Sequence, residues 1–186
     1  MTPTPDITVR PVQAGDLPAV ANLDRLAFAP LVSNEVVETE WYGGSLDLPG
    51  RRLFLAVETD TGAAVGGYAQ LHLGIWFQGR ELPAIGIAAV AVAPHRRGQR
   101  IARLLLDHAL TLGKQNAIPI IALYPFQHGF YRKLGWAWVG QAHQYRVSTQ
   151  DLPVYPERSQ IYPYQAVHHQ ESLKQVYALA ASQHNG

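Results

Sequence analysis

The sequence has no cysteine, a single methionine, and nearly equal numbers of acidic and basic residues, which leave a formal net charge of +1. The absence of cysteine excludes disulfides, thiolate metal sites and cysteine nucleophiles. The small net charge gives no electrostatic reason to expect a nucleic-acid partner. No apolar run is long enough to span a membrane, and the N-terminus lacks the apolar segment of a secretion signal. We therefore expect a cytoplasmic protein with neither a membrane span nor a nucleic-acid partner.

Histidine is present eight times, which raises the question of a metal site. His168 and His169 lie in a polar segment near the C-terminus, and His143 stands alone in an expected strand. His108 lies on a helix that we expect to be buried on one side. No two histidines have the H-x-x-x-H spacing, and no spacing of carboxylates supports zinc. We predict that the chain binds no metal.

The hydrophobic pattern predicts an α/β fold with a mixed sheet. Apolar runs predict strands at residues 7–12, 52–58, 64–77, 81–92, 118–123, 136–139 and 143–147. Helical spacing predicts helices at about residues 17–29, 32–41, 101–114, 127–134 and 165–183. We expect Asp16 and Ser33 to cap the first two helices. The order β-α-α-β-β-β-α-β-α-β-β favours helices on both faces of the sheet, with strand 118–123 parallel to strand 81–92.

The chain divides into a main domain at residues 1–149 and a C-terminal part at residues 150–186. The C-terminal part begins with an extended segment rich in proline and tyrosine and ends in a polar helix. Several apolar residues of that helix need a surface on which to bury. The body of the domain, a second copy of the chain or another protein can each provide it, so we expect either a homo-oligomer or a protein partner as alternatives to packing within one chain.

The stretch from Ile87 to Leu112 organises the main domain. An apolar strand stops at Pro94, a basic turn follows, and an amphipathic helix begins near Ile101. This arrangement offers backbone N–H groups and positive charge to a phosphate. The G-x-G-x-x-G motif of dinucleotide-binding folds and the G-x-x-x-x-G-K-[ST] motif of P-loops are both absent. A basic β–α turn on the surface of another α/β domain is the alternative interpretation.

The turn resembles the acetyl-CoA signature of the GCN5-related N-acetyltransferase (GNAT) family, R/Q-x-x-G-x-G/A. Residues 97–102 match this signature, except that Arg100 stands where the first glycine is expected. A second motif, from Phe130 to Trp136, resembles the F-Y-x-K-x-G-[FWY] segment of the same family. The resemblance covers about residues 7–149 and implies the GNAT fold, with acetyl-CoA as co-substrate.

The resemblance also implies roles for individual residues. The backbone of strand residues would pair with the pantetheine arm, and an N–H near Val90 would face the acetyl carbonyl; these residues are Val90, Ala91 and Val92. The turn would bind the pyrophosphate through Arg97, Gly98, Gln99, Arg100, Ile101 and Ala102. The backbone of Phe126 and Gln127 would meet the other side of the pantetheine. Tyr131 would protonate the leaving thiolate.

A closer resemblance is to the enhanced-intracellular-survival (Eis) branch of the family. It rests on residues 76–90, on Leu123 to Phe126 leading to Phe130 and Tyr131, and on the tail at residues 174–186. Members of that branch are typically much longer, with a second acetyltransferase-like domain and a sterol-carrier-like domain. The chain is therefore either a short member or a fragment of a longer Eis-like enzyme.

The general base and the acceptor site are less well defined by the sequence. In the Eis branch the base is the terminal carboxylate of the last domain, to which only Gly186 could correspond here. Glu58 and His72 are the other candidates. The acceptor site is expected in a set of acidic and aromatic residues suited to a cationic amine. They are Glu35, Glu38, Glu40, Trp41, Tyr42, Trp76 and Phe77.

We therefore predict an N-acetyltransferase that moves the acetyl group directly from acetyl-CoA to a primary amine in a ternary complex. The amine is a small cationic molecule, a protein lysine or an N-terminus. No covalent enzyme intermediate is expected. The alternative is a non-catalytic module that keeps the fold to bind a protein or to sense CoA, which the arginine at position 100 favours and Tyr131 opposes.

Overall fold

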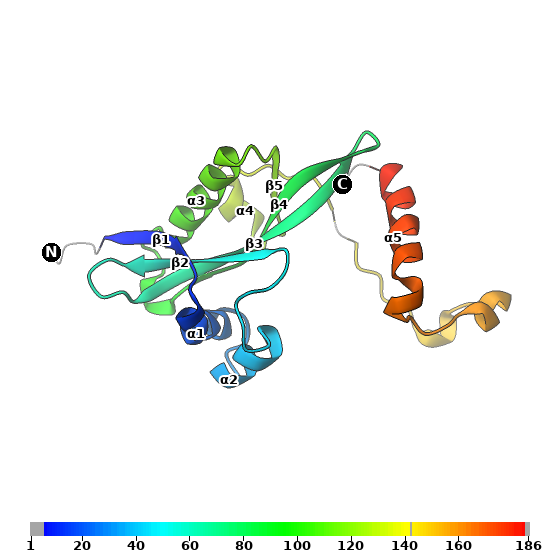
Figure 1. The fold of residues 1–186 in the computed structure, drawn as a ribbon, viewed down its shortest axis with the longest axis horizontal. Coiled ribbons are helices and arrows are strands. Elements are labelled where there is room, and N and C mark those ends of the chain that lie inside the picture. The colour runs from blue at the N-terminus through cyan, green and yellow to red at the C-terminus, as the bar shows by residue number, and fades with distance from the viewer. Residues whose placement is uncertain (1–5, 142, 185–186) are drawn as a thin grey trace. The chain divides into compact units, whose positions relative to one another are not determined.

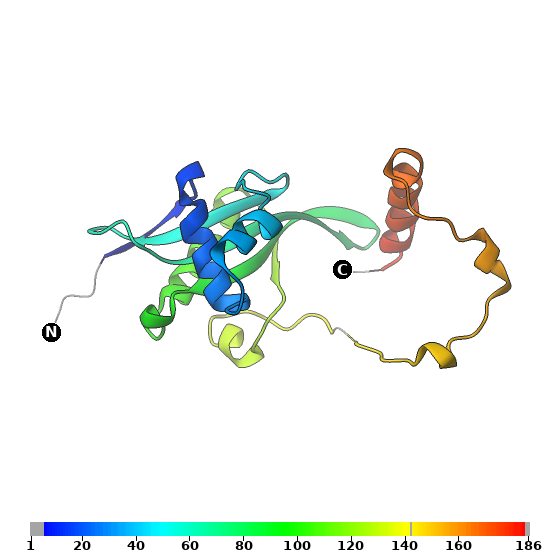
Figure 2. The ribbon, with the colours of Figure 1, turned by 90° about the horizontal axis from the view of Figure 1, so that it is seen from below.

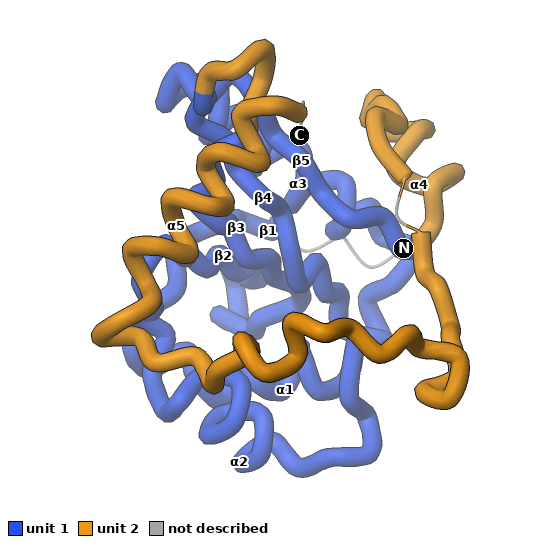
Figure 3. The backbone as a smooth tube through the Cα atoms, turned by 90° about the vertical axis from the view of Figure 1, so that its right-hand side faces the viewer, with its two compact units in different colours: residues 1–75, 81–126 blue, residues 76–80, 127–186 orange. Residues whose placement is uncertain are grey.

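The computed structural model describes residues 6–141 and 143–184. The N-terminal tail at residues 1–5 and Gly186, the candidate base, lie outside the described residues. The chain forms two compact units, coloured separately in Figure 3. Unit 1 comprises residues 1–75 and 81–126, and unit 2 comprises residues 76–80 and 127–186.

Unit 1 is built on a five-stranded mixed sheet with the strand order β1-β2-β3-β4-β5 (Figure 1). The strands are β1 (Ile7–Pro11), β2 (Arg51–Glu58), β3 (Ala64–Phe77), β4 (Arg80–Val92) and β5 (Ile120–Leu123). Strand β2 is antiparallel to both β1 and β3, and β5 is parallel to β4, as predicted. The parallel pair is connected by helix α3 (Ile101–Gln115), which is the crossover that parallel strands require.

Helices cover both faces of this sheet. Helix α1 (Leu17–Phe28) and helix α2 (Asn34–Val36), which continues into a π-helical turn (Val37–Trp41), lie on one face, and α3 lies on the other. Figure 2 shows α1 and α2 in front of the strands. The core on this face is made of apolar side chains from the helices and from alternate strand positions, including Val20, Leu23, Val37, Leu53, Leu55 and Ala91. On the other face α3 buries Ile101, Leu105, Leu106 and Ala109.

The two predicted helix caps have different outcomes. Ser33 caps α2 as predicted, since its Oγ accepts a hydrogen bond from the Val36 N–H at 3.3 Å. Asp16 makes no side-chain cap for α1, so that prediction is wrong. A 3₁₀ turn precedes α1, and the Asp16 carboxylate instead accepts from the Gln13 N–H at 2.7 Å and from Arg10 at 2.6 Å. The carboxylate thereby stabilises the 3₁₀ turn rather than the helix.

Gly66 of β3 allows a close approach between the sheet and α3. A Cβ atom at this position would lie 2.9 Å from the Ala91 carbonyl oxygen and 3.0 Å from Ile101 Cγ2. We expect Gly66→Ala to destabilise the fold by about 1–3 kcal/mol, because the backbone of β4 must move to accept the methyl group. Urea denaturation measures this free energy. Gly15→Ala is the matched control, since nothing lies within 4 Å of its added Cβ; an equal loss in both variants would contradict the prediction.

Unit 2 contains the tip of the β3–β4 hairpin and the chain from Gln127 onward. At the tip, Gln78 and Gly79 both have positive φ, at 50° and 73°, as a two-residue type I′ turn requires. The helices are α4 (His128–Arg132) and α5 (Ala166–Ser182), and the latter confirms the predicted C-terminal helix. No helix in the described part of the chain combines the length and apolar character needed to cross a membrane.

The two predicted strands at residues 136–139 and 143–147 are wrong. The described residues of this segment form no strand. Aromatic and β-branched residues favour strands mainly because they pack against neighbouring strands, and here most of them are exposed, including Trp138, Val139, Tyr145 and Val147. Trp138 instead stacks on His128, with ring centroids 4.4 Å apart. The observed order therefore lacks the last two strands of the prediction.

Candidate active site

Strands β4 and β5 separate at their carboxyl ends. Their pairing ends at Ile87 opposite Leu123, whereas β4 continues to Val92. Ala89 has a positive φ of 49°, which interrupts the extended backbone just after the separation. Residues Ala88–Val92 therefore have no partner on the β5 side among the described residues. Their backbone groups on that side are available to an extended, amide-containing ligand.

The loop after β4 offers further backbone donors. Gly98 and Arg100 have positive φ, at 80° and 62°, and α3 begins directly afterwards at Ile101. The N–H groups of residues 98–102 have no hydrogen-bond acceptor among the described residues. A helix N-terminus with free N–H groups favours an anion. Arg100 keeps the left-handed backbone that glycine adopts most easily, so the departure from the signature leaves the shape of the loop intact.

The basic residues of this loop have different surroundings. Arg97 and Arg100 are exposed. Arg96 forms an ion pair with Glu58. Glu58 also accepts a hydrogen bond from the Thr61 hydroxyl at 2.8 Å. Glu58 therefore ties the loop to β2, and this pairing argues against its role as a base.

The other predicted cofactor residues lie on both sides of the unit boundary. Ala91 is buried in the core below α1, and Val90 and Val92 are half-buried. Phe126, which follows β5 in unit 1, is exposed. Gln127 precedes the first residue of α4 in unit 2.

Tyr131 is the most buried aromatic residue of α4. Only 6% of it is exposed, and its ring contacts those of Phe130 and Trp136 edge-on, at centroid distances of 5.1 Å and 6.5 Å. Its neighbour Phe130 is only half-buried. Burial raises the pKa of the Tyr131 phenol. Like an ordinary tyrosine it is protonated at neutral pH, and the raised pKa makes it a weaker acid.

A second buried phenol lies on the α3 side of the sheet. The Tyr68 hydroxyl lies 2.9 Å from His108 Nδ1, and the Tyr68 ring stacks on Phe54 at 5.0 Å. Burial lowers the pKa of His108, so the imidazole is held neutral. In the described part of the chain no group of three or more histidine, aspartate or glutamate side chains could hold a metal ion.

The predicted acceptor set is not a single surface. Glu35, Glu40 and Trp41 are exposed, but Tyr42 is buried, with 4% of it exposed. Its hydroxyl donates a hydrogen bond to Asp24, a buried residue of α1 that the sequence interpretation missed. A signal was present, because Asp24 occupies the otherwise apolar stripe of α1 between Val20 and Ala27.

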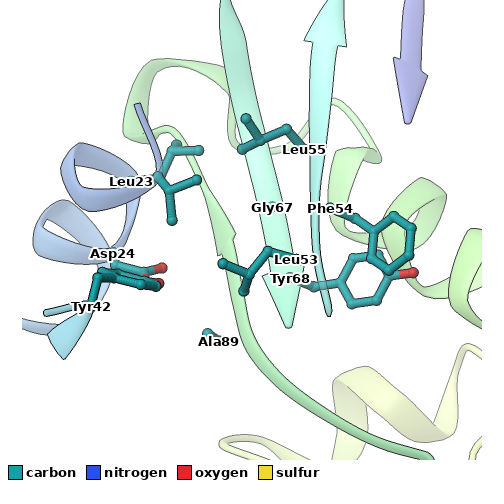
Figure 4. A pocket seen from close by; sticks show the side chains of 10 residues that line it. Leu23, Asp24, Tyr42, Leu53, Phe54, Leu55, Gly67, Tyr68 and Ala89 are labelled. Atoms are coloured by element: carbon teal, nitrogen blue, oxygen red, sulfur yellow. The ribbon is translucent and has the colours of Figure 1, made fainter. Parts of the chain in front are cut away.

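A small hollow opens beside this pair (Figure 4). It has room for about one water molecule. Asp24, Tyr42 and Ala89 contribute to its wall, and most of the other lining residues are apolar, among them Val20, Leu23, Leu53 and Leu55. Asp24 and Ala89, the residue just after the separation of β4 from β5, thus lie beside the same small space.

The sheet is mixed, and its parallel strands separate next to a basic loop. This architecture agrees with a comparison of the sequence with models of protein families. The model of the acetyltransferase (GNAT) domain matches residues 8–139. The chain belongs to the GNAT family. Members of this family are acetyltransferases that use acetyl-CoA, and the unpartnered donors of the loop fit the anionic part of that co-substrate.

Solved structures with the same fold include proteins of very different length. A GCN5-related N-acetyltransferase from Kribbella flavida is 28% identical with a TM-score of 0.58, and the match covers 71% of this chain but 33% of that one. The corresponding protein from Anabaena variabilis is 26% identical with a TM-score of 0.57, at 69% and 31% coverage. This GNAT chain therefore spans about a third of each.

A third structure, the aminoglycoside N-acetyltransferase AAC(6')-Iy in complex with CoA, is 15% identical with a TM-score of 0.63. The match covers 79% of this chain and 98% of that one, and at this identity it shows the fold alone. A comparison with curated proteins gave no match.

Proposed function

We propose that this GNAT protein transfers the acetyl group of acetyl-CoA directly to a primary amine in a ternary complex. The observation that carries the proposal is the separation of β4 from β5, which leads into a loop of unpartnered N–H groups. The backbone of Val90, Ala91 and Val92 would hold the pantetheine arm, with Phe126 and Gln127 on its other side. A thioester held in this groove supplies an activated acetyl carbonyl to an incoming amine.

The loop residues would bind the pyrophosphate. Arg97, Gly98, Gln99, Arg100, Ile101 and Ala102 present consecutive N–H groups at the start of α3, and two of them are exposed cations. Backbone donors aligned at a helix N-terminus stabilise phosphate without requiring a particular side chain. Arg100 has the left-handed conformation that glycine adopts most easily. This supports a loop that still binds phosphate despite the substitution. A module that senses CoA would need the same loop, so only measured thiol release separates it from the enzyme.

Tyr131 would donate a proton to the leaving thiolate. A tyrosine carries its proton at neutral pH, as a general acid must. The chain supplies no cysteine for a covalent acetyl intermediate. Direct attack by the amine is therefore the simplest route.

The experiment is calorimetric titration with acetyl-CoA, followed by measurement of free thiol with spermidine, a lysine-containing peptide and an aminoglycoside as acceptors. We expect binding together with thiol release that depends on the amine. Arg97→Ala should weaken acetyl-CoA binding by about 10- to 100-fold, because a charge-assisted contact to phosphate is lost.

Arg103→Ala is the matched control for this variant. Arg103 is an exposed cation on α3 that pairs with Asp107 at 3.4 Å, and its loss should leave the affinity for acetyl-CoA unchanged. Absence of binding by the unaltered chain would overturn the assignment of the loop. Binding without thiol release for any amine would favour the non-catalytic, CoA-sensing alternative.

We also propose that the chain is related to the Eis branch. Support comes from the sequence resemblance at residues 76–90, at residues 123–131 and at residues 174–186. Residues 1–149 as the acetyltransferase domain, residues 150–186 as an extension, and the cytoplasmic location remain predictions. So does a second copy or a protein partner for α5, whose Leu173, Val176, Tyr177 and Leu179 are exposed.

A further inference from the structure

Arg96 differs from the rest of the basic loop after β4 in its burial. In the segment 94–100, all of which the structure describes, Arg96 is half-buried and the other residues are exposed. The Arg96 side chain is 18% exposed and forms an ion pair with Glu58, whose side chain is 12% exposed. Arg96 ends the 3₁₀ turn Pro94–Arg96 and therefore stands at the start of the loop that we propose for the pyrophosphate.

Glu58 is held in place on both its backbone and its side chain. It is the last residue of β2, and its N–H donates to the Ala63 carbonyl at 3.0 Å. Its own carbonyl accepts from the Gly62 N–H at 2.8 Å, which closes the turn between β2 and β3. One carboxylate oxygen pairs with Arg96, and the other accepts from the Thr61 hydroxyl at 2.8 Å. The carboxylate therefore has a fixed orientation toward Arg96.

The Arg96 guanidinium connects this carboxylate to the loop. Its Nη2 pairs with Glu58 Oε1, and its Nη1 donates to Gln99 Oε1 at 3.3 Å. Gln99 lies between Gly98 and Arg100, the two residues with positive φ that shape the loop. Because a guanidinium is planar and presents its donors in a fixed fork, holding one end of it also places the other. A continuous chain of contacts thus runs from β2 to the middle of the loop.

This chain of contacts has a physical consequence for ligand binding. A left-handed backbone is unfavourable for a residue other than glycine, so Arg100 keeps it only where the surroundings hold it there. The ion pair is well suited to hold it, since a pair that is mostly removed from water is screened little by salt. A loop that is already ordered loses less conformational entropy when its ligand binds, which raises affinity.

We propose that Arg96 and Glu58 are positioning residues for acetyl-CoA, a role that rests on the acetyl transfer proposed above. The pair fixes the loop in the conformation that binds the pyrophosphate. Arg96 does not contact the phosphate itself, because both of its terminal nitrogens are already engaged. Arg97 and Arg100 are the exposed cations of the loop and are free to reach the ligand. The three arginines thus divide into one that orders the loop and two that bind.

The test is a double-mutant cycle in the full chain, measured by calorimetric titration with acetyl-CoA. Arg96→Met keeps an unbranched apolar stem and removes the guanidinium, and Glu58→Gln removes the opposite charge at nearly constant size. Each single variant should raise the Kd about 10- to 30-fold, as expected when the ordering of about one residue moves into the binding step. The double variant should bind within about threefold of Arg96→Met, because no pair is left to break.

A direct contact between Arg96 and phosphate predicts a different cycle. Arg96→Met would then cost the same affinity with glutamate or with glutamine at position 58, and the effects would be additive. Additive effects, or an unchanged Kd in either single variant, would remove Arg96 and Glu58 as positioning residues.

A second measurement separates positioning of the loop from a general disturbance of the domain. S-Acetylpantetheine has the thioester and the pantetheine arm of acetyl-CoA but lacks the pyrophosphate. Arg96→Met should lower kcat/KM about 10- to 30-fold for acetyl-CoA and leave it within about threefold for S-acetylpantetheine. At saturating acetyl-CoA, kcat should be unchanged. Equal losses with both thioesters would contradict the proposal.

Arg10→Met is the matched control. Arg10 pairs with Asp16 at 2.6 Å elsewhere in unit 1, with side chains 34% and 17% exposed. Its replacement also breaks a partly buried ion pair, and it should leave the Kd for acetyl-CoA unchanged even if the Tm falls. If the Arg96 or Glu58 variants do not fold, Gln99→Met breaks the contact with Arg96 at an exposed residue. The Kd should then rise about three- to tenfold, the loss for one hydrogen bond, and an unchanged Kd would overturn the proposal.

The outcomes also separate this inference from the proposed function. Binding and thiol release by the unaltered chain, together with an additive cycle, would leave acetyl transfer standing and remove only the positioning role. No binding of acetyl-CoA by the unaltered chain would overturn both.

Discussion

Replacement of Tyr131 by phenylalanine should lower kcat for thiol release by about 100- to 10,000-fold, the range for loss of a general acid. The change removes one oxygen atom from a buried ring and keeps the edge-on contacts with Phe130 and Trp136. The loss should therefore appear in turnover and not in binding. Steady-state thiol release and calorimetric titration with acetyl-CoA measure the two quantities separately.

Tyr145→Phe is the matched control for this substitution. Tyr145 is an exposed tyrosine of the same unit, and loss of its hydroxyl should leave both kcat and affinity unchanged. If Tyr131→Phe turns over as fast as the unaltered chain, Tyr131 is a packing residue and another group, or water, protonates the thiolate. A reduced affinity at unchanged kcat would give it a binding role instead.

Truncation of Leu105 to alanine should destabilise the fold by about 2–5 kcal/mol, which is the range for a fully buried leucine. Leu105 is 0% exposed on α3, and its Cδ1 lies within 3.2 Å of the position that a Cβ on Gly66 would take. Removal of its branched end leaves a cavity between α3 and β3 that the tight packing at Gly66 cannot fill by collapse. The free energy of unfolding in urea measures the effect.

The neighbouring residue provides the control. Leu104 is on the same helix but 37% exposed, so Leu104→Ala has the same effect on helix propensity with little cavity. We expect it to cost less than about 1 kcal/mol. Similar losses in the two variants would mean that α3 is not seated on the sheet as described. A destabilised α3 should also weaken acetyl-CoA binding, since its N-terminus carries the loop.

The elements with strong local patterns were predicted well. Strand β3 has the predicted bounds, and β5 is parallel to β4 because a short connection after a helix permits little else. The segment from Ile87 to Leu112 contains the predicted strand, turn and helix. The same residues form these elements and provide the backbone N–H groups of the candidate site. The sequence therefore predicted both the local structure and the proposed binding groups. The family signature was recognisable despite Arg100 for the same reason.

The predictions that failed depended on partners elsewhere in the chain. Residues 136–147 have the composition of strands, but a strand requires a neighbour, which composition does not supply. The sequence favoured Asp16 as a helix cap, but its carboxylate instead accepts hydrogen bonds from Arg10 and from the Gln13 N–H. Tyr42 was assigned to a surface from its neighbours Glu40 and Trp41, whereas its hydroxyl binds Asp24, 18 positions earlier.

The sequence by itself determined the family, the α/β class and the loop that we propose for the cofactor, because each of these is encoded in contiguous residues whose spacing reflects backbone geometry. The tertiary structure alone decided which polar groups are buried and what they contact. The ion pair of Glu58 with Arg96, and the cluster of Asp24, Tyr42 and Arg51, join residues from separate elements. Burial and electrostatic coupling arise only when such elements pack.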